Sequence, residues 1–218
     1  MAVLLTFAAL IGCSEKQAVR KDDTQPSVQN KVDDGKEYQG PFGLAEGIPV
    51  DELISKFGFS VTKEDPDVYS GLPPKPNEKF SDYTYIATKK HGLCKIVAFT
   101  KTIETNSFSE QVVDLYKEIS GNLESKYGKP SFDFNYIEKG SVWDQPEDLS
   151  TALSKNEAKI EKSWFDKEKG VTLPNKLSAI SIKIIGTEKD EAFVTLAYTF
   201  NVNEKCVEHF KEEQKSSL

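Results

Sequence analysis

The residues with the most reactive side chains are few, and the two histidines illustrate this. His91 stands in Lys89-Lys90-His91-Gly92, which we expect to be a turn, and His209 lies in the C-terminal tail. Zinc sites are built from His, Cys or carboxylate side chains at short, regular spacings. The nearest approach to such a spacing joins His209 to Glu212 or Glu213. We therefore expect both histidines at the surface and predict no metal site.

Sequence motifs of common enzymes are also missing. The chain lacks Gly-x-Ser-x-Gly, Gly-x-x-x-x-Gly-Lys-Ser/Thr, Gly-x-Gly-x-x-Gly and His-Glu-x-x-His, which mark hydrolases, nucleotide-binding proteins and metalloproteases. Asp65-Pro66-Asp67 with Glu64 lacks the regular ligand positions and the glycine of a calcium loop, so we interpret it as a solvated loop. The sequence thus indicates no catalytic, cofactor-binding or metal residue. A glycosidase-type pair of carboxylates stays open, because such residues meet only in the folded chain.

Cys13 follows an apolar run at the N-terminus. Residues Val3 to Ile11 are apolar apart from Thr6, and the run is well short of the ~20 residues that a helix needs to cross a bilayer. Its end, Leu10-Ile11-Gly12-Cys13, resembles the lipobox of bacterial lipoproteins. The chain departs from that pattern in having no Lys or Arg ahead of the run. The alternative is a buried strand or helix with an ordinary thiol at Cys13.

The resemblance implies a mature protein that lipid holds on a membrane. It makes residues 1–12 a lipoprotein signal peptide, places a diacylglyceryl group on the Cys13 sulfur, and adds an acyl group to the new amino terminus. Each buried CH₂ contributes ~0.8 kcal/mol, so two or three chains anchor durably. The implied partner is the lipid bilayer, through acylated Cys13. Ser14, directly after Cys13, resembles the residue found at this position in lipoproteins that are passed to the outer membrane. We therefore expect a lipid-anchored protein of the cell envelope, on the outer membrane and facing the periplasm.

If Cys13 carries lipid, Cys94 and Cys206 are left. We expect these two to form a disulfide, because the compartment outside the cytoplasm is oxidising. In the chain-entropy model, a bond that closes a loop of about 110 residues stabilises the folded state by ~4–5 kcal/mol. Two alternatives stay open: a pair of buried free thiols, and unpaired thiols in a Gram-positive envelope.

Residues 13–38 are expected to be the lipidated N-terminus and a flexible tether. From Ser14 to about Glu37 there is no aromatic residue and there are few apolar ones, so the segment cannot bury enough surface to offset its ordering entropy. The whole chain has a net charge of −7, with 28 basic residues interleaved among 35 acidic ones. Nucleic acid is therefore not an expected partner, because a phosphate backbone is bound by concentrated Lys and Arg.

Residues 39–214 are expected to form a single α+β domain. Alternating apolar residues predict one hairpin at 83–103 that turns at 89–92, and a second at 180–202 that turns at 188–190. Another strand is predicted at 132–136, with its three aromatic residues on one face and its other face toward water.

Helices are predicted between these strands. A short helix at 50–57 ends at Gly58, and a longer one begins at a capping box of Ser107 and Glu110 and ends at Gly128. Pro146 opens a third helix, which the run containing Ile160 and Trp164 continues after a break. The sum is an antiparallel sheet of about five or six strands with helices packed on one face.

These features favour a membrane-anchored envelope lipoprotein that acts as a binding or accessory module without catalysis, and whose partner is another envelope protein. The alternative is an envelope hydrolase or hydrolase inhibitor with a site gathered from residues distant in sequence. A deep polar pocket with clustered carboxylates would favour the enzyme, and a flat or protruding apolar patch would favour the binder.

Overall fold

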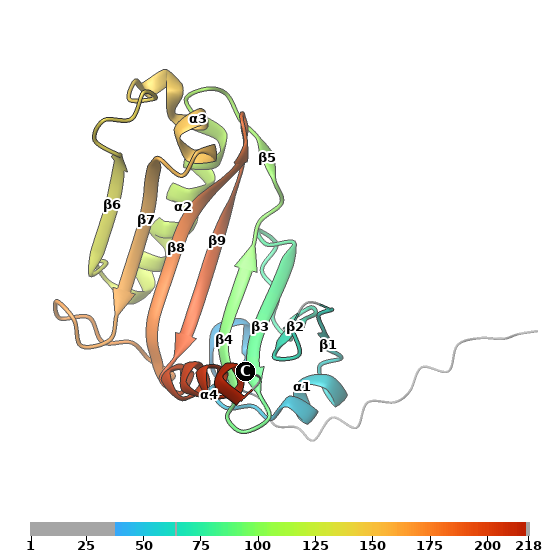
Figure 1. Cartoon of the computed structure of the whole chain (residues 1–218). Coiled ribbons are helices and arrows are strands. Elements are labelled where there is room, and N and C mark those ends of the chain that lie inside the picture. Colours follow the sequence, from blue (N-terminus) through green and yellow to red (C-terminus); the bar gives the residue numbers. More distant parts are fainter. Residues whose placement is uncertain (1–37, 64, 217–218) are drawn as a thin grey trace, which may run out of the picture. The chain divides into compact units, whose positions relative to one another are not determined.

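A computed structural model describes residues 38–63 and 65–216, which fold as an antiparallel sheet with helices (Figure 1). The sheet order is β1-β2-β3-β4-β9-β8-β7-β6, and β5 also pairs with β9. The strands are β1 (Ser60–Val61), β2 (Val68–Ser70), β3 (Asp82–Thr88), β4 (Gly92–Phe99), β5 (Ile103–Glu104), β6 (Phe132–Ile137), β7 (Ala158–Phe165), β8 (Leu177–Glu188) and β9 (Glu191–Phe200). The helices are α1 (Val50–Ser55), α2 (Glu110–Tyr127), α3 (Leu149–Ser154) and α4 (Asn203–Ser216), with 3-10 turns at η1 (Pro41–Gly43) and η2 (Pro146–Asp148). The α+β class and the antiparallel sheet are confirmed.

The predicted strand count is wrong, because the described residues form nine strands rather than five or six. Three of the additional strands, β1, β2 and β5, are two or three residues long, too short to give a recognisable alternation. A fourth is β7, whose sequence pattern instead predicts the continuation of a helix. Ile160 and Trp164 lie four residues apart, and this spacing puts two side chains on one face of a strand as well as of a helix.

Both predicted hairpins are confirmed. Strands β3 and β4 pair across the turn at 89–91, and β8 pairs with β9 across the turn at 189–190. The first hairpin contains a β-bulge, since Ile86 pairs with Lys95 while Ala87 pairs with Leu93. Cys94 is the additional residue on β4, and a bulge of this kind bends its strand and re-aims a side chain.

The long helix α2 is confirmed, although its predicted start is wrong. It begins at Glu110 rather than beside Ser107, and the Glu110 N–H donates to Oδ1 of Asn106 at 3.1 Å. A turn precedes it, in which the N–H of Ser109 donates to the carbonyl of Asn106. Asn106 therefore takes the capping role that the capping-box pattern gave to Ser107. The helix ends where Gly128 adopts a positive φ of 80°, as glycine commonly does at this position.

The sheet has one covered face and one open face. On the covered face, the buried side chains of β2, β3, β4, β7, β8 and β9 form the core with α2 and the N-terminal segment. These strand residues are Tyr69, Tyr83, Tyr85, Ile96, Ala98, Ile160, Trp164, Ile180, Ile182, Ile184, Val194, Leu196, Tyr198 and Phe200.

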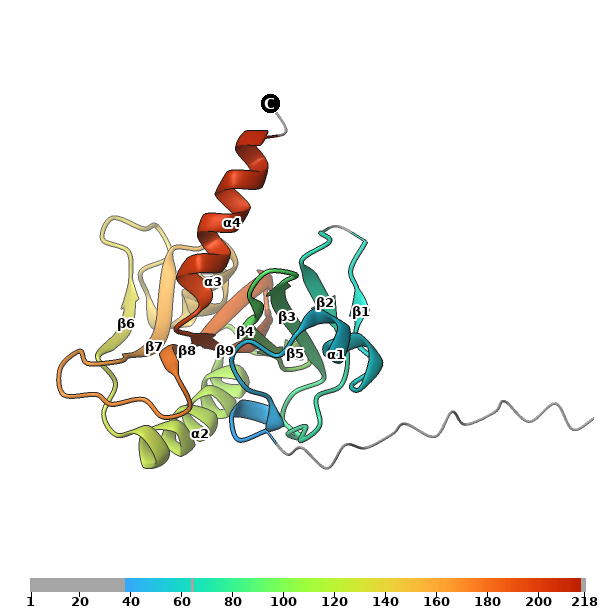
Figure 2. The same cartoon turned by 90° about the horizontal axis from the view of Figure 1, so that it is seen from below.

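The helices do not all lie on the covered face, which corrects that part of the prediction. Helix α2 packs on β8 and β9, and α3 lies over the same face at Gly186, where a Cβ would meet the backbone of Ser154 at 2.5 Å. Helix α4 instead projects from the opposite side of the sheet, at the end near β4 (Figure 2).

Candidate functional site

The strand β6 forms an open edge of the sheet. It pairs with β7 from Phe132 opposite Ser163 to Ile137 opposite Ala158 without a register shift, and no described strand lies on its other side. The opposite edge of the sheet is β1, which is only two residues long. Proteins usually protect edges with Lys, Pro, bulges or very short strands. Within β6 there is no Lys, Pro or bulge, and Asp133 is its single charged residue, pointing toward the covered face.

The backbone groups that face this edge follow from the register. The N–H of Glu138 donates to the carbonyl of Glu157 at 2.6 Å, one step beyond the pair of Ile137 and Ala158. Hydrogen-bonded pairs alternate along an antiparallel ladder, so every second residue back from Glu138 also faces β7. Asp133, Asn135 and Ile137 therefore turn their N–H and C=O groups outward.

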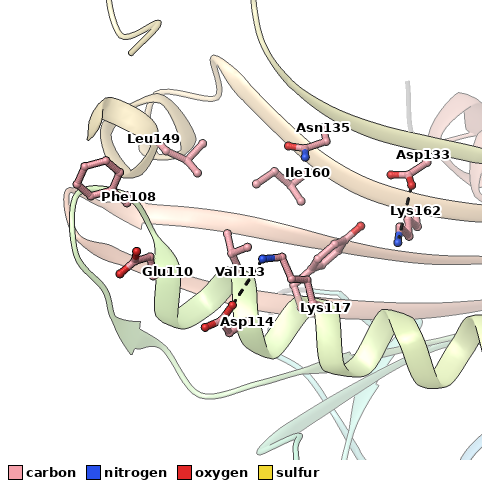
Figure 3. Close-up of a pocket in the computed structure, with 11 residues that line it drawn as sticks. Phe108, Glu110, Val113, Asp114, Lys117, Asp133, Asn135, Leu149, Ile160 and Lys162 are labelled. Carbon is pink, nitrogen blue, oxygen red and sulfur yellow. Dashed lines mark ion pairs between the residues drawn. The ribbon is translucent and has the colours of Figure 1, made fainter. Parts of the chain in front are cut away.

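A cavity of about 720 Å³ adjoins β6 on the covered face, between α2 and the inner sides of β6 and β7. Helix α2 packs mainly on β8 and β9 and reaches β7 through Glu124, which pairs with Lys162. Figure 3 shows Asp133, Asn135, Ile160 and Lys162 on the strand side, with Glu110, Val113, Asp114 and Lys117 on the helix side. A second cavity of about 600 Å³ shares Phe108, Asn135 and Leu149 with the first. The two are neighbours, and together we call them the α2–β6 groove.

The charged residues of the groove are mixed, with three carboxylates and two ammonium groups in the larger cavity. The Lys162 ammonium lies 2.6 Å from Glu124 Oε1 and 3.8 Å from Asp133 Oδ2. Lys117 lies 3.6 Å from Asp114 Oδ1. Both ammonium groups are thus engaged by carboxylates, and Asp133 keeps only one long contact to Lys162.

The most unusual group in the groove is the Tyr116 hydroxyl. Tyr116 lines the cavity with only 4% of its surface exposed, and its hydroxyl has no hydrogen-bond partner among the described residues. Burial raises the pKa of Tyr116, as do the nearby carboxylates of Asp133, Glu161 and Glu124. A buried polar group normally has a partner, and an unpaired one costs about 1–3 kcal/mol. The hydroxyl is therefore a site where a bound ligand could supply the missing partner.

The aromatic side chains of β6 lie on the open face of the sheet. Phe132 stacks on Phe134 with ring centroids 6.0 Å apart, and Phe134 meets Tyr136 edge-on at 6.3 Å. The Lys169 ammonium lies 3.8 Å from the centroid of Phe132, and that of Lys159 lies 4.2 Å from Phe134. Lys159 also pairs with Glu161 on this face at 3.3 Å, so the outer side of β6 is an aromatic surface with mixed charges.

The alternation in β6 predicts that Asp133 and Asn135 face water, and both are exposed. The sequence does not indicate that they also line the α2–β6 groove. Tyr116 belongs to the buried face of α2, and its helical spacing indicates a core residue and nothing more. No sequence signal reveals an unpaired hydroxyl, because its isolation depends on strands that follow it in the chain.

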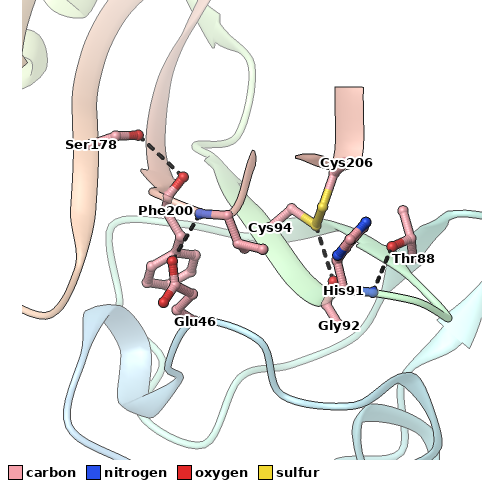
Figure 4. Close-up of a disulfide and its surroundings, with 9 residues drawn as sticks. Glu46, Thr88, His91, Gly92, Cys94, Ser178, Phe200 and Cys206 are labelled. Atoms are coloured by element: carbon pink, nitrogen blue, oxygen red, sulfur yellow. Dashed lines mark hydrogen bonds between the residues drawn. A yellow bond between two sulfur atoms is a disulfide. The ribbon is translucent and has the colours of Figure 1, made fainter. Parts of the chain in front are cut away.

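The predicted disulfide is present, while the predicted lipid site lies outside the described residues. Cys94 and Cys206 are joined, with their Cα atoms 6.6 Å apart, and this bond attaches α4 to β4 (Figure 4). Cys13, the lipobox and residues 1–37 of the predicted signal peptide and tether fall in the part of the chain that the structure does not describe.

The disulfide also brings the two histidines together. The rings of His91 and His209 lie 6.3 Å apart between centroids, and both are partly exposed and border one surface depression. Burial lowers the pKa of His91, and the charges of Lys90, His209 and Lys205 lower it further. Within the described residues, no three His, Cys, Asp or Glu side chains gather as metal ligands.

Among residues 38–63 and 65–216, no helix combines the length and apolar character needed to cross a membrane. Comparisons of this chain with protein-family models, curated proteins and solved structures find no match.

Proposed function

We propose that this chain is an envelope lipoprotein, anchored through acylated Cys13, whose domain binds an extended segment of another envelope protein by strand addition at β6. The observation that carries the proposal is the open edge of β6, where Asp133, Asn135 and Ile137 present backbone donors and acceptors and no described strand pairs with them. An added strand gains affinity from main-chain hydrogen bonds and specificity from pockets for alternate side chains. The α2–β6 groove is such a pocket, directly beside the edge.

The position of the domain supports the same function. The lipobox Leu10-Ile11-Gly12-Cys13 and the polar segment after it favour a tethered domain that is free to reorient. Ser14 favours the outer membrane, with the domain in the periplasm. Replacing Cys13 by Ser should move the protein from the membrane fraction to the soluble fraction and leave the signal peptide uncleaved. Unchanged membrane association of Cys13→Ser would contradict the anchor without bearing on the β6 edge.

The edge itself is tested by site-specific photo-crosslinking in the full-length, membrane-anchored protein. A benzoylphenylalanine at Tyr136, at the end of β6, should crosslink to one envelope protein, and the crosslinked segment should be mapped by mass spectrometry. The matched control is the same residue at Val61 on β1, because both side chains are 47% exposed. The Val61 position should not capture the same segment.

Two substitutions of Asn135 decide whether that crosslink depends on strand addition. Asn135→Pro removes a backbone N–H that points outward, which an edge strand tolerates. Asn135→Thr removes the same amide side chain but keeps the N–H. We expect the crosslink to be lost in Asn135→Pro and kept in Asn135→Thr. A crosslink that persists in Asn135→Pro would refute the proposal.

A further inference from the structure

We infer that the α2–β6 groove accepts an arginine side chain of the added strand, whose guanidinium binds the Tyr116 hydroxyl and the Asp133 carboxylate. This inference rests on the proposed function, and it names the partner as a segment with arginine at a groove-facing position. The inference is supported by the direction of side chains in an added strand, by the unpaired Tyr116 hydroxyl, and by the charges of the groove.

Side chains of an added strand can reach the groove only from alternate positions. The outward-facing residues Asp133 and Asn135 both line the cavity. In an antiparallel pair, residues directly opposite each other place their side chains on the same face, with Cβ atoms about 5 Å apart. A residue opposite Asp133 or Asn135 therefore points into the groove, while its neighbours in the strand point toward the aromatic side of β6.

The Tyr116 hydroxyl calls for a polar ligand. The side chain is more than nine-tenths buried, lines the cavity, and has no described partner for its hydroxyl. A purely apolar side chain in the groove would leave this hydroxyl unpaired and would keep water away from it. A ligand that donates a hydrogen bond to the Tyr116 oxygen removes that cost. The hydroxyl proton is then free to be donated to a carboxylate.

The charges favour a cation over an anion. Both lysines of the groove already contact carboxylates, and Asp133 has only the 3.8 Å contact to Lys162 as an ion pair. An anionic ligand would meet Glu110, Asp114 and Asp133, whereas a cation completes the pairing of Asp133. The Asp133 side chain is 56% exposed, so water screens part of this ion pair, whereas a hydrogen bond at the buried Tyr116 oxygen is shielded from water.

Arginine fits this site better than lysine. Phe108, Val113 and Ile160 supply apolar walls for an aliphatic stem, along which Arg and Lys stems pack while their charged heads reach polar groups. A guanidinium has five donors in a plane, so it can serve a carboxylate and a hydroxyl together. It also stacks on aromatic rings, and the Tyr116 ring borders the same cavity.

The test uses the purified full-length protein with Cys13→Ser. The ligands are two blocked peptides, Ac-Thr-Val-Arg-Val-Thr-NH₂ and the same peptide with citrulline in place of arginine. Citrulline keeps the shape of arginine and removes its charge. We measure Kd by titration with ¹⁵N NMR. The arginine peptide should bind roughly 10- to 100-fold more tightly than the citrulline peptide, the range expected for hydrogen bonds to a charged group.

Three variants assign this difference to the groove. Tyr116→Phe and Asp133→Asn should each bring the Kd of the arginine peptide about tenfold closer to that of the citrulline peptide. Glu168→Gln, which removes an exposed carboxylate in the loop after β7, should leave both values unchanged. Equal binding of the two peptides, or an unaffected difference in both groove variants, would overturn the inference.

Asn135→Pro separates this inference from the proposed function. If it weakens both peptides while arginine gives no advantage, strand addition stands and the arginine site is refuted. If it leaves both peptides unaffected while arginine keeps its advantage, the groove binds guanidinium without an added strand and the proposed function is refuted. Binding by neither peptide would overturn both.

Discussion

Removing the Tyr116 hydroxyl should stabilise the protein. The hydroxyl is buried in the folded chain without a described partner, whereas in the unfolded chain it is hydrated. Leaving a buried polar group unpaired costs about 1–3 kcal/mol. Tyr116→Phe keeps the ring and its packing, so it should raise the free energy of unfolding by about 1 kcal/mol, the low end of this range. For a domain of about 150–250 residues, that corresponds to a rise in Tm of roughly 2–4 °C.

The matched control for this prediction is Tyr85→Phe. Tyr85 is also fully buried, but its hydroxyl donates to the carbonyl of Gly71 at 3.0 Å. Its loss should lower the free energy of unfolding by about 1 kcal/mol, because it removes one hydrogen bond and leaves an acceptor unpaired. Urea unfolding and calorimetry at neutral pH measure both variants. If Tyr116→Phe is destabilised as much as Tyr85→Phe, the Tyr116 hydroxyl has a partner and the reasoning fails.

Three further predictions concern the stability of the fold. Cys206→Ser should lower the free energy of unfolding by up to about 4.7 kcal/mol, because the Cys94 bond spans 112 residues; an unchanged urea midpoint would show that the bond does not form. Burial raises the pKa of Tyr85, Tyr116 and Tyr198 above 10.0, so above pH 10 the unfolded chain releases protons that the folded chain retains. Stability should therefore fall as the pH rises past 10, and a flat profile of Tm from pH 9 to 11 would contradict this. Gly186→Ala should lower the free energy of unfolding by at least about 2 kcal/mol, because the new Cβ would lie 2.5 Å from the backbone of Ser154. Gly121→Ala on α2 meets nothing within 4 Å and should raise that free energy by about 0.5–1 kcal/mol. Equal melting temperatures for the two variants would be inconsistent with this packing.

The long elements were predictable because one physical pattern governs each of them. The helix α2 buries a single stripe, and the hairpin of β8 and β9 buries alternate residues over ten or more positions. Tertiary packing there reinforces the local periodicity. The same logic fails for β7, where Ile160 and Trp164 fit both periods and no intervening glycine or proline separates a strand from a helix.

The orientation of β6 shows a different limit of sequence reasoning. Its alternation was identified, but an aromatic face normally indicates the core, and here Phe132 and Phe134 lie on the open face of the sheet. The register with β7 decides this, because Asp133 pairs with Lys162 and Asn135 pairs with Ile160 on the covered face. Only the position of the strand at the edge, beyond the reach of α2, makes such an arrangement stable.

The candidate site could not be derived from the chain, since it joins α2 to strands that come later. Tyr116 carries the helical spacing of a core residue, and its hydroxyl lacks a partner only because β6 and β7 close over it without providing one. The pairing of Cys94 with Cys206 was easier to predict. With three cysteines in the chain and Cys13 expected to carry lipid, these two are left to pair, and the bulge that places Cys94 need not be known.

The pairing of β4 with β9 has a consequence for how the protein is made. Residues 95–99 pair with residues 195–199, so β4 meets its neighbour β9 only after the intervening residues have been synthesised. Such distant pairing slows folding, because the chain loses the entropy of loop closure before the stabilising contacts form. Until then β4 is itself an exposed edge, and chaperones that shield nascent strands from aggregation should be required at this stage.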